Sequence, residues 1–75
     1  MNNNLRIVLK KKYEAEIVDA KYKIDCFSQQ ELIIPEHPDI TGEVDKLLAK
    51  ISSAEDKMAV IELHYGKNGT DKAVL

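Results

Sequence analysis

The chain has 75 residues, of which 44% are hydrophobic, 32% are charged and only four are aromatic. This length allows one small domain, residues 1–75, because a second domain needs at least about 50 further residues. The single cysteine, Cys26, excludes an intramolecular disulfide, so a small apolar core must hold the fold alone or with a partner.

The first twelve residues do not have the pattern of a secretory signal, since Arg6 interrupts a short apolar run and three lysines follow it. No segment approaches the roughly 20 apolar residues of a membrane span. We therefore expect a cytoplasmic protein without membrane contact. The abundance of Lys, Asn and Ile is typical of small proteins of AT-rich bacteria and their phages, where we expect its source.

The N-terminal third alternates between apolar and polar residues, as half-buried strands do. Leu5, Ile7 and Leu9 form the first such pattern, and a second runs from residue 12 to 26. The alternation changes phase at Ile17, which predicts a bulge or bend near residue 18. A helix over residues 10–20 is the alternative, because Tyr13, Ile17 and Ala20 have helical spacing.

A helix is predicted over residues 39–52, after a short strand at residues 31–34 that Pro35 ends. Asp39 or Thr41 can cap its first turn. Its apolar stripe recurs every three to four residues and consists of Ile40, Val44, Leu47, Leu48 and Ile51. Gly42 weakens the start by up to about 1 kcal/mol relative to alanine.

The C-terminal third favours a β-hairpin. Ala59, Ile61, Leu63 and Tyr65 alternate with polar residues, and Asn68-Gly69 is typical of a tight hairpin turn. Residues 70–75 then return as the closing strand. A second helix is the alternative, because Ala54, Met58, Ile61 and Tyr65 share one helical face and Gly66 would end it.

The predicted fold class is therefore α+β. We expect a small antiparallel sheet of four to five strands, one amphipathic helix (about 39–52) packed on one face, and a C-terminal β-hairpin. The strand interpretation leaves Tyr13, Ala15 and Ile17 out of phase with the later strand face. These three residues are the predicted protein interface, with Tyr13 as its anchor.

No group of residues has the spacing of a catalytic or metal site. The only thiol–imidazole pair combines Cys26 with His37 or His64, and Cys26 continues an apolar face where a thiol is an ordinary core residue. So short a chain also leaves little room for a concave pocket. We expect no enzyme activity, no cofactor and no bound metal.

The function that we expect is non-catalytic binding of another macromolecule, as a regulator, inhibitor or accessory subunit. The partner is another protein or a second copy of the chain, in a homodimer or a higher oligomer. The alternative is nucleic-acid binding through the basic N-terminal segment. Its candidate contacts are Arg6, Lys10, Lys11, Lys12, Lys21 and Lys23.

Overall fold

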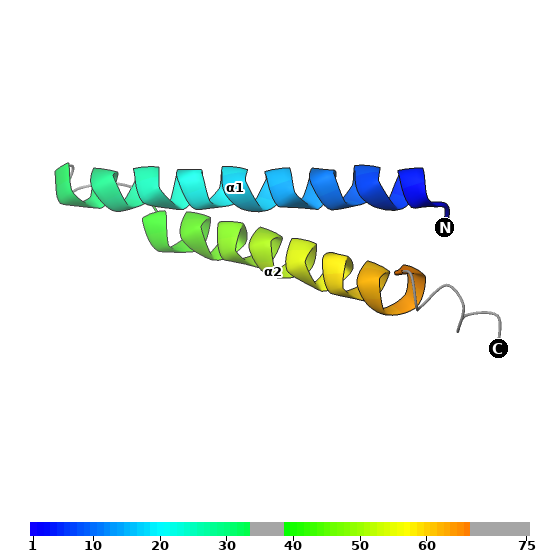
Figure 1. The fold of residues 1–75 in the computed structure, drawn as a ribbon. Coiled ribbons are helices and arrows are strands. Elements are labelled where there is room, and N and C mark those ends of the chain that lie inside the picture. The colour runs from blue at the N-terminus through cyan, green and yellow to red at the C-terminus, as the bar shows by residue number, and fades with distance from the viewer. Residues whose placement is uncertain (34–38, 67–75) are drawn as a thin grey trace.

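The protein is an antiparallel helical hairpin. A computed structural model describes residues 1–33 and 39–66, and 93% of this part of the chain is helical. Helix α1 spans Asn3–Ile33 and helix α2 spans Ile40–Tyr65. The two lie side by side and run in opposite directions, which gives an elongated molecule of 57 × 19 × 12 Å (Figure 1).

The contact between the helices, which we call the seam, follows a regular repeat. On α2 the buried and half-buried side chains are spaced alternately by four and three residues, the repeat by which one helix face follows a neighbouring helix. They are Ile40, Val44, Leu47, Ile51, Ala54, Met58 and Ile61. The corresponding apolar side chains of α1 are Leu9, Tyr13, Ile17, Ala20, Ile24 and Phe27.

The most buried positions of the seam are small. Ala20 on α1 and Ala54 on α2 are each 1% exposed, while Ile40 and Ile61 are 8% and 7% exposed. No large side chain in the described ranges is completely buried. Two helices alone cannot surround a core on all sides. The hairpin therefore removes little apolar surface from water.

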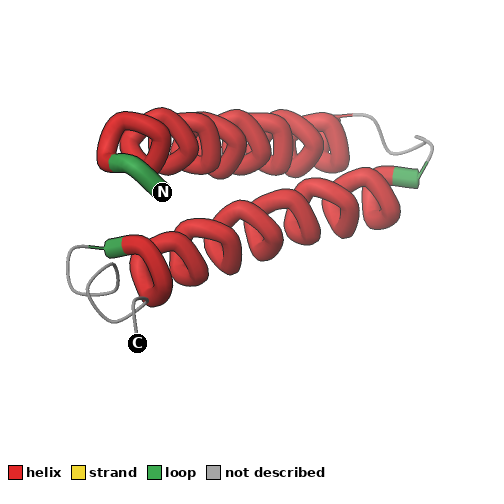
Figure 2. The backbone as a smooth tube through the Cα atoms, turned by 90° about the vertical axis from the view of Figure 1, so that its right-hand side faces the viewer, coloured by secondary structure: helices red, strands yellow, loops and turns green. Residues whose placement is uncertain are grey.

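The helices are closest near the connection and diverge toward the N-terminus of α1 and the C-terminus of α2 (Figures 1 and 2). A salt bridge spans this diverging end, where Nη1 of Arg6 lies 3.2 Å from Oε1 of Glu62. The guanidinium of Arg6 also donates to Oδ1 of Asn3 at 2.6 Å. Neither helix is long and apolar enough, within the described residues, to cross a membrane.

Helix α2 begins where the sequence predicts. The side chain of Asp39 caps it and accepts a hydrogen bond of 2.9 Å from the amide of Gly42. A Cβ atom at residue 42 would collide with this carboxylate, so glycine leaves room for the cap. The weak helix former at this position therefore has a structural reason.

The predicted α+β class is wrong, because residues 1–33 and 39–66 contain two helices and no strand. The segments expected as strands at 5–9, 12–26 and 31–33 all lie within α1. The helical alternative for residues 10–20 is the one that the structure supports. The N-terminal alternation arises because α1 has apolar side chains on two opposite faces. Along the sequence, the residues of these two faces together alternate with polar residues, as in a strand.

The predicted helix at 39–52 is correct in its start and too short, since α2 continues to Tyr65. The strand expected over residues 59–65 is wrong, because Ala54, Met58 and Ile61 extend the helical spacing of Ile51 without a break. Gly66 follows the last helical residue, and its amide donates to the carbonyl of Glu62 at 3.2 Å. The Asn68-Gly69 turn, the closing strand and Pro35 lie outside the described residues.

The cap of α2 can be tested by substitution. We expect Asp39→Ala to lower the free energy of unfolding by about 1 kcal/mol, because the amide of Gly42 loses its acceptor. Asp39→Asn, which keeps a side-chain oxygen, is the control and should stay within about 0.5 kcal/mol of the original protein. Urea unfolding followed by circular dichroism measures both. Equal losses in the two variants would contradict a capping role.

The conflict between Gly42 and the cap predicts a coupling. Gly42→Ala alone should change stability little, because a gain of up to about 1 kcal/mol in helix propensity is offset by displacement of the Asp39 carboxylate. In an Asp39→Ala background the same substitution should stabilise by most of that amount. A double-mutant cycle in urea measures the difference, and additive effects would refute the steric explanation.

Candidate protein-binding surface

The side of α1 that points away from α2 carries its own apolar stripe, which we call the outer face. It is defined by Val8, Ala15, Val18 and Tyr22. Val8 is 61% exposed, and Val18 and Tyr22 are each 67% exposed. Their spacing places them about half a helical turn from the seam residues. Helix α1 is therefore apolar on two opposite sides, and only one of them has a partner in the hairpin.

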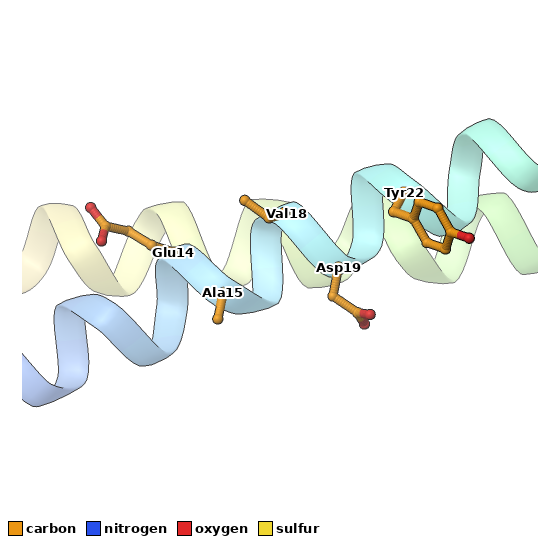
Figure 3. A pocket seen from close by; sticks show the side chains of 5 residues that line it. All are labelled: Glu14, Ala15, Val18, Asp19 and Tyr22. Atoms are coloured by element: carbon orange, nitrogen blue, oxygen red, sulfur yellow. The ribbon is translucent and has the colours of Figure 1, made fainter.

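The middle of the outer face is a shallow depression. Ala15, Val18 and Tyr22 line it along the helix, and the carboxylates of Glu14 and Asp19 lie at its margins. Figure 3 shows Ala15, Val18 and Tyr22 on the side of α1 that faces the viewer. Glu14 and Asp19 point to opposite edges of the helix, and α2 passes behind it. A row of apolar side chains next to a small residue, bordered by charges, is suited to contact with another helix.

Charged residues of both signs border the outer face. One flank carries Lys10, Glu14 and Lys21, and the other carries Lys12, Asp19 and Lys23. Three exposed ion pairs within α1 use these side chains: Lys11–Glu14 at 3.8 Å, Lys12–Glu16 at 3.3 Å and Lys23–Asp19 at 3.0 Å. Exposed pairs of this kind contribute only about 0–1 kcal/mol each and can be rearranged at little cost.

Tyr22 is the largest side chain of the outer face, and Cys26 lies one helical turn further along α1. Side-chain hydrogen bonding to Cys26 raises the pKa of the Tyr22 phenol, and the charge of the Cys26 thiolate and some desolvation act in the same direction. The phenol thus stays neutral to higher pH than a free tyrosine.

The three residues predicted as a protein interface are not on one face. Ala15 is exposed at the centre of the outer face, whereas Tyr13 and Ile17 are half-buried and belong to the seam. Lys57 of α2 lies 5.5 Å from the centre of the Tyr13 ring, which places that ring beside the second helix. The grouping depended on a strand, in which alternate residues share a side.

The six cations predicted to bind nucleic acid are distributed around α1 rather than gathered on one side. Arg6 pairs with Glu62 across the seam, and its side chain is only 18% exposed. Lys11, Lys12 and Lys23 each pair with a carboxylate of the same helix. Lys10 and Lys21 share the flank that also carries Glu14. Within the described residues the six cations therefore lie on more than one side of α1.

The structure does not bring Cys26 and His64 together as a thiol–imidazole pair. Cys26 lies in the last quarter of α1 and His64 in the last turn of α2, at opposite ends of the antiparallel hairpin. Among residues 1–33 and 39–66 no three His, Cys, Asp or Glu side chains form a group that could hold a metal ion. His37 lies outside the described residues.

The strand pattern predicted over residues 12–26 did not reveal the outer face. In a strand, Val18, Ala20, Tyr22 and Ile24 share one side. A helical projection separates the two pairs, since Val18 and Tyr22 are spaced by four residues and Ala20 and Ile24 form a second such pair. The outer face could therefore have been found from a helical projection of the sequence.

Comparison with protein-family models, curated proteins and solved structures gives no match.

The contact between Tyr22 and Cys26 gives a spectroscopic prediction. Cys26→Ala removes the hydrogen bond and the thiolate charge, so the pKa of Tyr22 should fall toward its ordinary value of 10.0. Absorbance at the phenolate band during an alkaline titration measures this change. The control is Cys26→Ala in a Tyr22→Phe background, where the remaining titration should not move. An unchanged curve in the first comparison would contradict the contact.

Proposed function

We propose that the protein is a small non-catalytic binding protein, a regulator, inhibitor or accessory subunit, which contacts another protein through the outer face of α1. One observation carries this proposal: Val8, Val18 and Tyr22 form an exposed apolar row opposite the seam. An ordered apolar row on a small protein, bordered by polar residues, is typical of an interaction surface.

Hydrophobic burial supplies the driving force for such a contact. Covering apolar surface contributes roughly 25 cal/mol per Å², and the seam alone buries little. Tyr22 is the expected anchor, because a tyrosine offers a large apolar ring with few rotatable bonds. The partner surface is best supplied by an amphipathic helix, whose ridge of side chains can enter the depression at Ala15.

Two further features support the proposal. The described residues hold no group of three or more His, Cys, Asp or Glu side chains that could bind a metal ion, and Cys26 and His64 lie at opposite ends of the hairpin, so a non-catalytic role fits them better than chemistry. Nucleic-acid binding has less support, because the cations of α1 lie on several sides of the helix and Arg6, Lys11, Lys12 and Lys23 pair with carboxylates. We place the protein in the cytoplasm, where its single thiol, Cys26, would remain reduced.

Photo-crosslinking in the source cell tests the proposal. A photoreactive phenylalanine at position 22 should give a protein adduct, which mass spectrometry identifies as a second copy or a different protein. Val18→Glu in the same chain should reduce the adduct about tenfold or more, because a charge would then have to be buried in the contact. Circular dichroism should show the same helix content with and without this substitution.

Leu63→Glu is the matched control, since Leu63 is 71% exposed and lies on α2, away from the outer face. It should leave the adduct unchanged. A nuclease-sensitive adduct at position 22 would favour the nucleic-acid alternative. Absence of any adduct, or equal loss in both glutamate variants, would overturn the proposed function.

A further inference from the structure

We propose that the outer face of α1 binds the outer face of a second copy, with the two α1 helices antiparallel and a two-fold axis between Glu16 and Ile17. This inference rests on the proposed function and names the partner of that surface. It is carried by the order of apolar and charged residues along α1. That order is complementary to itself when the helix is reversed.

The apolar stripe has the repeat of a helix that pairs with another helix. Two series of residues recur every seven positions along the stripe. One consists of Val8, Ala15 and Tyr22, and the other, which is offset by three residues, consists of Lys11, Val18 and Asp25. In the antiparallel pair Ala15 lies opposite Val18 of the second copy, and the axis generates the same contact twice. The small alanine allows the helices to approach where the valine of the second copy enters.

The two polar members of the stripe are complementary as well. With the axis at residues 16 and 17, Lys11 lies opposite Tyr22 of the second copy, and Val8 lies opposite Asp25. The ammonium of Lys11 then sits within one helical turn of the Asp25 carboxylate of the other chain. The aliphatic stem of the same lysine covers the tyrosine ring, and Lys11 can therefore join an apolar contact while keeping its charge paired.

The flanks carry matching charges. In an antiparallel pair each flank meets the same flank of the other copy. Glu14 then approaches Lys21 of the second copy, and Lys12 approaches Asp19. Each contact occurs twice because of the two-fold axis, so four attractive pairs surround the central apolar layers. Lys21 makes no ion pair within residues 1–33 and 39–66, which leaves its ammonium available.

Other arrangements of the same two faces bring like charges together. A parallel pair would place Lys11 beside Lys11, Asp25 beside Asp25 and Glu14 beside Asp19 of the second copy. Sliding the antiparallel pair by seven residues in one direction brings Glu14 to Glu14 and Lys12 to Lys12. The slide in the other direction brings Lys21 to Lys21 and Asp19 to Asp19. Among these arrangements, the charges of α1 favour the antiparallel pair with its axis between Glu16 and Ile17.

The hairpin leaves room for this contact. Helix α2 lies on the opposite side of α1 (Figure 3), so the two α1 helices would be central and the two α2 helices outermost. The seam stays intact in this assembly. The contact would bury side chains that are exposed to water in the single chain, above all Val18 and Tyr22.

Disulfide trapping tests the arrangement directly. In a Cys26→Ala background, chains with Val8→Cys are mixed with chains with Asp25→Cys under mild oxidation. A mixed 8–25 disulfide should form, because these residues face each other in the antiparallel pair. Neither 8–8 nor 25–25 disulfides should form, since about 25 Å of helix separates each residue from its own copy, beyond disulfide reach.

Charge exchange supplies an independent test by sedimentation. Glu14→Lys should raise the dimer dissociation constant about tenfold, because two attractive contacts become repulsive. Adding Lys21→Glu to the same chain should restore the original constant. Asp56→Lys, which makes the same charge change on α2, is the matched control and should leave dimerisation unchanged.

The outcomes separate this inference from the proposed function. Predominant 8–8 or 25–25 disulfides would overturn the antiparallel register, and a monomer at millimolar concentration would overturn self-pairing altogether. In the second case a photo-adduct of position 22 with a different protein would leave the proposed function standing. Failure of Lys21→Glu to rescue Glu14→Lys would contradict the assignment of that charge pair.

Discussion

Close packing along the seam is the constraint on which the rest of the structure depends. Ala20 and Ala54 are almost completely buried, and their small side chains let the two helix backbones approach. The isoleucines at residues 40 and 61 then contribute the larger buried area. Because this contact fixes one side of α1 against α2, it also determines which apolar residues stay in water. The outer face exists as a surface only because the seam uses the other side.

A helix with apolar side chains on two opposite sides differs from an ordinary surface helix. In an ordinary surface helix one apolar stripe meets the core and the remaining side is polar. Helix α1 instead carries most of its charges on the two flanks and keeps Val18 and Tyr22 exposed opposite the seam. Such a pattern suits a helix placed between two apolar neighbours. The hairpin provides one of them, and a binding partner would provide the other.

The same two-sidedness explains why the fold was difficult to read from the sequence. Between residues 18 and 26 apolar and charged residues alternate, which is the period of a strand. In the helix Ala20 and Ile24 point to the seam, while Val18 and Tyr22 point outward. The alternation is thus the overlap of two helical stripes. Helix α2 has a single stripe, and there the start, the cap at Asp39 and the spacing as far as Ile51 were predicted correctly.

The end of α2 and the candidate surface were missed for a related reason. The predicted helix ends at Ser52, although Ala54 and Met58 continue the repeat of Ile51 and packing against α1 outweighs the weak helix propensity of Ser52 and Ser53. Only Ala15 of the predicted interface lies on the outer face. Which side of α1 is free becomes clear only when α2 is in place, because the sequence shows both apolar stripes equally.

The flanks of α1 carry two pairs of opposite charges at a spacing that is too long for an ion pair within one helix. Glu14 and Lys21 are seven residues apart on one flank, and Lys12 and Asp19 are seven apart on the other, with the order of signs reversed. Seven residues span about 10 Å, too far for an ion pair within the helix. An antiparallel neighbour of the same sequence brings each of these charges to its opposite. The seven-residue spacing therefore matches a contact between two α1 helices, in addition to the shorter ion pairs that Glu14, Lys12 and Asp19 make within α1.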